Sequence, residues 1–169
     1  MSQAETFITI VILILPLLIF VLAIFLAIAA IKHGLMGVKL SMTFEGNNKT
    51  AFKTASTLHM CTGVLTAIDI VASAGFLICM FGSALLSVWG IPFMLLFFVL
   101  AIVSFILGFV SSLVMGLSGI AMNKIYTRQM QVRQVIIKPF YNICAIVFSV
   151  LMVLPLILLI IAIGAAVIG

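Results

Sequence analysis

Residues 7–31 read FITIVILILPLLIFVLAIFLAIAAI, a run without a single charged side chain. A helix needs roughly 20 apolar residues to cross the hydrocarbon layer of a bilayer. Inside that layer every backbone amide must be bonded within the segment, and a helix satisfies this requirement alone. The stretch therefore predicts a membrane-spanning helix at residues 7–31.

Three further apolar stretches follow, at residues 58–81, 91–122 and 140–168. The whole chain is 66% hydrophobic and only 7% charged, whereas a soluble domain has about 25% charged residues. A chain of this size cannot bury so much apolar surface in a water-soluble core. We therefore expect an all-α integral membrane protein, one membrane domain over residues 1–169, with four transmembrane helices paired as two helical hairpins.

The basic residues fall in two short segments, 32–57 and 123–139, between the apolar stretches. With four spans, both segments lie on the same side of the membrane. Segments rich in Lys and Arg stay in the cytoplasm, which predicts both termini outside and two cytoplasmic basic loops. The basic side chains are then placed to meet anionic lipid headgroups; they are Lys32, Lys39, Lys49, Lys53, Lys124, Arg128, Arg133 and Lys138.

Asp69 lies near the middle of the second apolar stretch and belongs to a stripe of polar residues. A charge at that depth costs at least ~2.5–3.5 kcal/mol on insertion scales, and protonation would relieve much of this cost. The other members of the stripe follow at steps of three or four residues, the spacing of one helix face; they are His59, Thr62, Thr66 and Ser73. The stripe indicates either a proton or cation site or a hydrogen-bonded contact between helices.

Small residues form two more stripes, which let helix backbones approach closely. In the first apolar stretch and beyond it, they recur at steps of three and four residues; in the third, they recur at steps of four. Such stripes predict packing within one chain or packing between subunits of a ring or array. The first set is Ala23, Ala27, Ala30, Gly34, Gly37 and Ser41, and the second is Ser104, Gly108, Ser112 and Gly116.

The sequence lacks a nucleophile paired with a base, a cluster of metal ligands and a phosphate-binding loop. Its few basic residues are not interleaved with aromatic residues, as nucleic-acid binding would require. We expect a protein that is not an enzyme, with no cofactor, no metal site and no nucleic-acid partner. We expect His59 to be an interfacial anchor and His33 to be solvated.

The first hairpin reads Phe44-Glu45-Gly46, then Lys49, then Asp69, followed by Gly75. This order of residues and their spacing resembles that of the proteolipid c subunits of rotary ATPases. Proteolipids of the doubled form have two hairpins with polar turns in the cytoplasm and a carboxylate midway along an outer helix. The resemblance implies that Asp69 is an ion-binding acid.

The second hairpin matches that family less well. Gly116-Leu117-Ser118-Gly119 is similar to the small-residue inner helix, and Arg133-Gln134 is similar to the polar turn. The resemblance would place a second acid near residues 153–156, and none is present. The chain also has only 12 glycines and a net charge of +5, so only Asp69 is carried over.

Three functions are consistent with these features. The first is an integral subunit of a larger or oligomeric membrane complex with a mainly structural role. Its partners would be lipids, other membrane subunits or copies of itself. The second is a proteolipid-like subunit that moves protons or cations through Asp69, and the third is a pore-forming or holin-like protein.

Overall fold

A computed structural model describes the backbone over residues 3–86, 90–130 and 135–168 and the side chains over 17–75, 99–130, 135–153 and 157. All regular structure in these ranges is helical, which confirms the all-α class. A short 3-10 helix, η1, lies between the first two of four long helices. The elements are α1 Gln3–Leu40, η1 Ser41–Thr43, α2 Gly46–Leu86, α3 Gly90–Met130 and α4 Pro139–Ile168.

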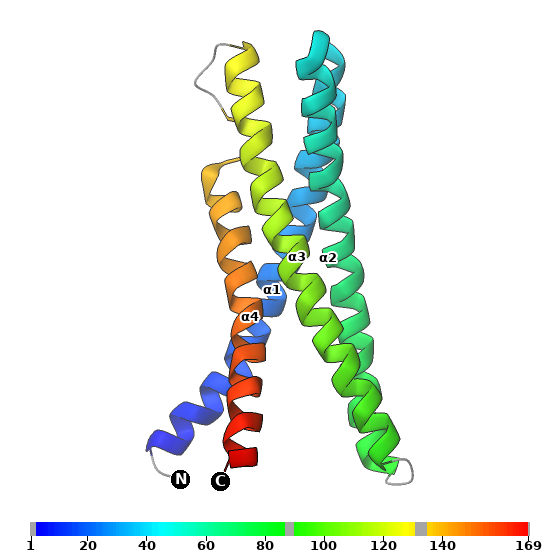
Figure 1. Cartoon of the computed structure of the whole chain (residues 1–169), viewed down its shortest axis with the longest axis vertical. Helices are drawn as coiled ribbons and strands as arrows, with labels where there is room; N and C mark the ends of the chain where they lie inside the picture. The colour runs from blue at the N-terminus through cyan, green and yellow to red at the C-terminus, as the bar shows by residue number, and fades with distance from the viewer. Residues whose placement is uncertain (1–2, 87–89, 131–134, 169) are drawn as a thin grey trace.

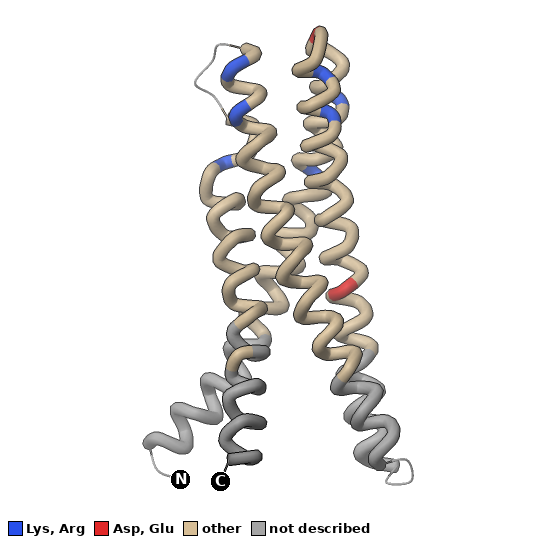
Figure 2. The backbone as a smooth tube through the Cα atoms, in the orientation of Figure 1, with Lys and Arg blue, Asp and Glu red and all other residues tan. Residues whose placement is uncertain are grey.

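The four long helices alternate in direction and form an elongated antiparallel bundle (Figure 1). The packing is mainly between helices that are consecutive in the chain, and the contact between α1 and α4 is much smaller. The α1–α2 turn and the C-terminal end of α3 consequently lie at the same end of the bundle. Figure 2 shows that the described Lys and Arg residues gather toward this end.

Among the residues whose side chains are described, three helical segments are long and apolar enough to cross a membrane: Leu17–Thr43, Gly46–Gly75 and Val99–Met130. The described part of α4 that is comparably apolar, Pro139–Val153, is shorter. Large aliphatic side chains are exposed on all four helices, among them Val21, Ile68, Ile106 and Val150. A contiguous apolar exterior of this kind is typical of a surface that faces lipid or another protein.

The helices extend well into the two basic segments, for which helical spacing past residue 31 and the lack of a helix breaker over residues 123–134 predict partly helical structure. α1 continues to Leu40, α2 already begins at Gly46, and α3 continues to Met130, so most of segments 32–57 and 123–139 is helical. The extension of α1 follows from apolar residues that keep helical spacing past residue 31. The reversal itself is short, and Gly46 adopts a φ of 63° there, a conformation that glycine reaches without steric penalty.

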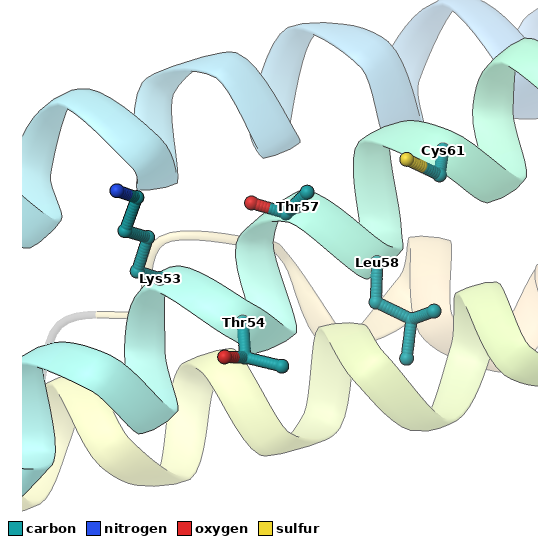
Figure 3. Close-up of a pocket in the computed structure, with 5 residues that line it drawn as sticks. All are labelled: Lys53, Thr54, Thr57, Leu58 and Cys61. Carbon is teal, nitrogen blue, oxygen red and sulfur yellow. The ribbon is translucent and has the colours of Figure 1, made fainter.

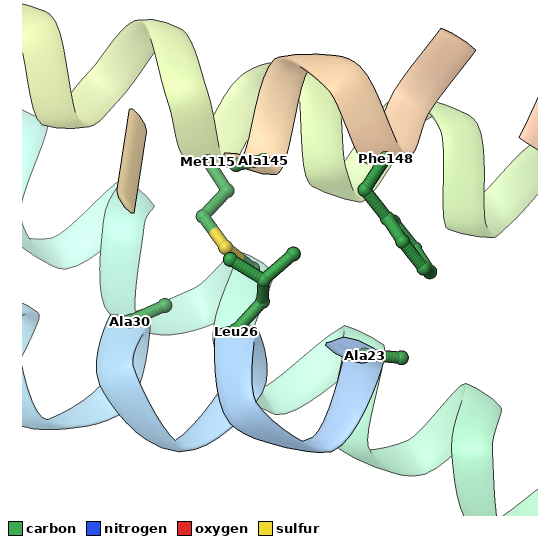
Figure 4. Close-up of a cluster of buried hydrophobic side chains, with 6 residues drawn as sticks. All are labelled: Ala23, Leu26, Ala30, Met115, Ala145 and Phe148. Carbon is green, nitrogen blue, oxygen red and sulfur yellow. The ribbon is translucent and has the colours of Figure 1, made fainter. Parts of the chain in front are cut away.

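The middle of the bundle is closed by apolar side chains from three helices (Figure 4). Leu26 and Ala30 of α1 meet Met115 of α3 and Ala145 and Phe148 of α4. Each of these side chains is at most 2% exposed. The three helices therefore share one core, and the chain holds together as one bundle in its described part.

A second apolar cluster lies near the basic end. Phe44 and Phe52 flank the α1–α2 turn with ring centroids 4.6 Å apart, and Met122 and Ile137 complete the cluster. A hydrogen bond of 2.6 Å from Asn48 to Gln129 also joins the ends of α2 and α3. This end of the bundle is thus a packed structure built from both hairpins.

Candidate functional site

The polar stripe of α2 faces α3 along a regular seam. Polar partners pair His59 with Ser118, Thr66 with Ser111, and Ser73 with Ser104. Each step of seven residues forward on α2 is matched by a step of seven backward on α3. A seven-residue repeat keeps the same face of two antiparallel helices in contact over several turns, so the stripe forms a continuous polar seam between the two hairpins.

His59 lies at the end of the seam that is nearer the basic end of the bundle, and its side chain is 3% exposed. Its Nδ1 atom lies 3.0 Å from the carbonyl oxygen of Met115 and 3.0 Å from the Ser118 hydroxyl. A carbonyl oxygen only accepts, so a hydrogen bond to Met115 requires the tautomer with the proton on Nδ1. An anchor in the membrane interface is expected to be exposed, and His59 is not: it is buried between helices, where α3 offers it two partners.

The middle of the seam is made of threonine and serine hydroxyls. Thr62 donates to the carbonyl of His59 and Thr66 to the carbonyl of Thr62, each at 2.9 Å. Thr66 also lies 3.1 Å from the Ser111 hydroxyl on α3. Back-bonding of this kind satisfies hydroxyl groups inside a helix, so these side chains are buried without loss of hydrogen bonds.

Asp69 belongs to a three-residue cluster with Ser104 and Ser73. Ser104 donates a hydrogen bond of 2.6 Å to Oδ1 of Asp69. Its hydroxyl oxygen lies 2.9 Å from that of Ser73, and Ser73 donates there because the Ser104 proton is already used. Both hairpins thus contribute to the surroundings of this acid.

The second oxygen of Asp69 lies over a glycine of α3. A Cβ atom on Gly108 would be 3.5 Å from Asp69 Oδ2 and 3.5 Å from the sulfur of Met152 on α4. The carboxyl group therefore points toward the place where α3 and α4 pack. Asp69 itself remains partly exposed, with the exposed Ile68 and Val71 on either side.

A further buried polar group, which the sequence analysis did not single out, lies next to the seam. Asn142 of α4 is 4% exposed, and its Oδ1 atom has no hydrogen-bond partner within the part of the chain that the structure describes. This oxygen lies directly over Gly119, with the ring of His59 beside it. Only a residue without a side chain allows α2, α3 and α4 to meet there.

His33 does not fit the expectation of a solvated residue. It is only partly exposed, and its ring meets that of Tyr141 edge-on at a centroid distance of 5.3 Å. Its Nδ1 atom is buried without a partner among the described residues. The approach of α4 to this part of α1 covers the ring.

The small-residue stripe of α1 lies against α2. A Cβ on Gly34 would be 2.6 Å from Met60, and Gly37 lies against Ser56. A Cβ on Gly63 of α2 would be 2.9 Å from the carbonyl oxygen of Ala27 and 2.9 Å from Cβ of Ala30, both on α1. The remaining members, Ala23 and Ser41, are buried as well. These residues therefore bring two helices of the same chain together.

The second small-residue stripe lies in contacts of α3 within the chain. Gly108 faces Asp69 and Met152, and a Cβ on Gly116 would be 2.6 Å from Ile146 of α4. Ser112 is 1% exposed and donates to the carbonyl of Gly108 at 2.5 Å. Ser104 belongs to the Asp69 cluster, so this stripe serves both neighbours of α3.

The basic residues that the structure describes lie in the C-terminal parts of α1 and α3, in the first turns of α2 and directly before α4. Lys39 lies in the last turn of α1, and Arg128 in the last turn of α3. The residues exposed to the surroundings are Lys32, Lys39, Lys49, Lys53, Lys124, Arg128 and Lys138. Arg133 lies outside the described residues.

Groups of three or more His, Cys, Asp or Glu side chains that could hold a metal ion do not occur within the described ranges. The polar seam instead holds one carboxyl, one imidazole and a series of hydroxyls. Groups of these kinds can pass or hold a proton, and they can equally bind helices together.

Comparison with known proteins gives no relative from which a function could be transferred. No protein-family model matches the chain, and no curated protein and no solved structure matches it significantly.

Proposed function

We propose that the chain is a four-span membrane protein, with both termini outside, that acts as a structural subunit of a membrane assembly. The three apolar segments long enough to cross a bilayer support the membrane placement. The fourth span is α4, which is 30 residues long over Pro139–Ile168. The basic end of the bundle then faces the cytoplasm, in keeping with the preference of Lys and Arg for that side.

The proposal that the chain belongs to an assembly rests chiefly on the partial exposure of Asp69. Ser104 satisfies one oxygen of this acid, but the residue remains partly uncovered between exposed aliphatic side chains. A carboxyl group that its own chain covers only in part is costly at this depth, by at least ~2.5–3.5 kcal/mol on insertion scales when it is charged. A neighbouring subunit that covers this part of the α2–α3 seam removes that cost.

Movement of protons or cations through Asp69 is the second candidate. It is favoured by the position of the acid on a seam that continues through hydroxyls to His59. A water-filled path along this seam would also solvate the exposed part of the carboxyl group. A pore lined by the same seam is the third candidate and requires several chains around one path.

Two variants of Asp69 separate these functions. Asp69→Asn keeps an oxygen that accepts from Ser104, whereas Asp69→Leu removes the polar group. For a structural subunit, the wild type and Asp69→Asn should elute as one assembly in mild detergent, and Asp69→Leu should elute as the single chain. A wild type that elutes as a monomer, or Asp69→Leu with unchanged mass and partners, would overturn the proposal.

The same variants in proteoliposomes test transport. If Asp69→Asn retains the assembly but abolishes a proton or cation flux seen with the wild type, the second candidate is supported. Ser104→Ala is the matched control, because it removes the hydrogen bond to Asp69 but leaves the acid in place. A flux that survives both Asp69 substitutions would exclude the acid as the ion carrier.

A further inference from the structure

A shallow groove of about 350 Å³ lies on the outer face of α2, near the basic end of the bundle. Five residues line it: Lys53, Thr54, Thr57, Leu58 and Cys61. All five are exposed. In Figure 3 the ammonium of Lys53 and the hydroxyl of Thr57 lie on the same flank of α2, the one toward α1, and Cys61 follows one turn further on.

The chemistry of the groove changes along the helix axis. It begins with an ammonium and two hydroxyls at residues 53–57 and ends with the apolar Leu58 and Cys61. The apolar face continues beyond the groove through Leu65 and Ile68, which are 51% and 60% exposed. From Lys53 to Ile68 a helix rises by ~22 Å, so one face carries a cationic head and a long apolar track.

The described part of the chain has few acids that could neutralise the cationic head. Glu45 precedes the start of α2, and Asp69 lies four turns beyond Lys53. Thr57 is an exposed residue, whereas Thr62 and Thr66 are buried and their hydroxyls donate to backbone carbonyls. Lys53 and Thr57 are therefore available to a ligand from the surroundings.

We propose that this groove holds one anionic phospholipid, with its phosphate between the Lys53 ammonium and the Thr57 hydroxyl and an acyl chain along Leu58, Cys61 and Leu65. A lysine binds phosphate as a point charge, and a hydroxyl donates a further hydrogen bond. Residue 58 is also where the apolar stretch of α2 begins, so the head of the groove lies at the depth of lipid headgroups. The inference rests on the membrane placement proposed above but not on the assembly.

The test compares lipid retention by two matched double variants of the full chain. The first, Lys53→Gln with Thr57→Val, removes the charge and the hydroxyl of the groove. The second, Lys124→Gln with Thr127→Val, makes the same chemical change on α3, where the Thr127 hydroxyl donates to the carbonyl of Asn123. Each is reconstituted in nanodiscs of an equal mixture of phosphatidylglycerol and phosphatidylcholine, and the lipids retained per chain after gentle extraction are measured by native mass spectrometry.

We expect the wild type and the α3 control to retain one phosphatidylglycerol, and the groove variant to retain it about fivefold less. Equal losses in both variants would show only a general attraction of anionic lipid to the basic end and would overturn the proposal. Unchanged retention by the groove variant would overturn it as well. Lipid retention is measured separately from the mass of the assembly. The mass tests the proposed function, and the retention tests the lipid site.

Alkylation of Cys61 gives a second measurement that needs no change in the head of the groove. In a chain with Cys79→Ser and Cys144→Ser, we expect phosphatidylglycerol to slow the reaction of Cys61 with maleimide relative to phosphatidylcholine. Equal rates in the two lipids would contradict an acyl chain lying over Cys61. Because this chain keeps Lys53 and Thr57, a folding defect of the double variant would not leave the question open.

Discussion

Ser104 reaches across from α3 to donate a hydrogen bond of 2.6 Å to the Asp69 carboxyl group on α2. Ser104 also contacts Ser73, in the same seven-residue register that pairs Thr66 with Ser111 and His59 with Ser118, and Asp69 lies one turn before Ser73 on the same face of α2. A polar group on such a seam specifies which turns of two helices face each other. The acid therefore has a structural consequence within the chain, whatever else it does.

Gly108→Leu should destabilise the chain, because the space over Gly108 is occupied by Asp69 Oδ2 and Met152. Overpacking of a filled contact costs typically about 1–3 kcal/mol. The free energy of unfolding is measured in mixed micelles with a rising fraction of SDS, followed by circular dichroism. Gly108→Ala is the control, since its Cβ would stand 3.5 Å from both groups and should fit. Equal stability of the Leu variant and the wild type would mean that the carboxyl group does not lie there.

The hydrogen bond between Thr66 and Ser111 should appear as a coupling energy of roughly 0.6 kcal/mol, the average found for such bonds between membrane helices. The measurement is a double-mutant cycle of Thr66→Val and Ser111→Ala in the same unfolding assay. Thr66 paired with Ser149→Ala serves as a control, because Ser149 donates to the carbonyl of Ile146 on α4 and should show no coupling. Additive effects of Thr66→Val and Ser111→Ala would contradict the seam.

Gly34→Ala should push α1 away from α2, because the added Cβ would be 2.6 Å from Cβ of Met60 and 2.7 Å from its backbone nitrogen. Backbone atoms cannot rotate aside, so we expect a loss of about 1–3 kcal/mol in the free energy of unfolding. Gly75→Ala makes the same change on α2, where no described atom outside the local helix backbone lies within 4 Å. That control should be neutral or slightly stabilising, since alanine has a higher helix propensity than glycine. Similar effects of the two variants would argue against the close α1–α2 contact.

The sequence was sufficient to predict helices and the face that carries the polar stripe, because apolar length and three- and four-residue spacing are local properties. It also contained the register of the seam. Ser104, Ser111 and Ser118 repeat every seven residues, as do His59, Thr66 and Ser73, and comparing these two repeats would have paired α2 with α3. The four-residue repeat of small residues in the third stretch instead predicts close helix packing at Gly108 and Gly116.

The environment of individual side chains was less accessible from sequence. His59 was expected at an interface and is buried, because the carbonyl of Met115 and the hydroxyl of Ser118 come from a helix distant in the chain. The burial of Asn142 could not be predicted, since an isolated amide near the start of a span has no periodic partner. Its position over Gly119 depends on how α4 docks, and docking is a tertiary property that spacing within one helix does not specify.

The proposed topology predicts opposite labelling at the two ends of the bundle. In a chain with Cys61, Cys79 and Cys144 replaced by serine, Lys49→Cys should be reached by a membrane-impermeant maleimide only after the cells are permeabilised. Ser2→Cys should be labelled on intact cells. Asn48-Lys49-Thr50 fits the acceptor sequence for N-glycosylation. With the basic end in the cytoplasm, it would stay unglycosylated, because glycosylation occurs on the outer side. Labelling of Lys49→Cys on intact cells would place the basic end outside, against the preference of Lys and Arg for the cytoplasm, and would reverse the topology while leaving the polar seam unchanged.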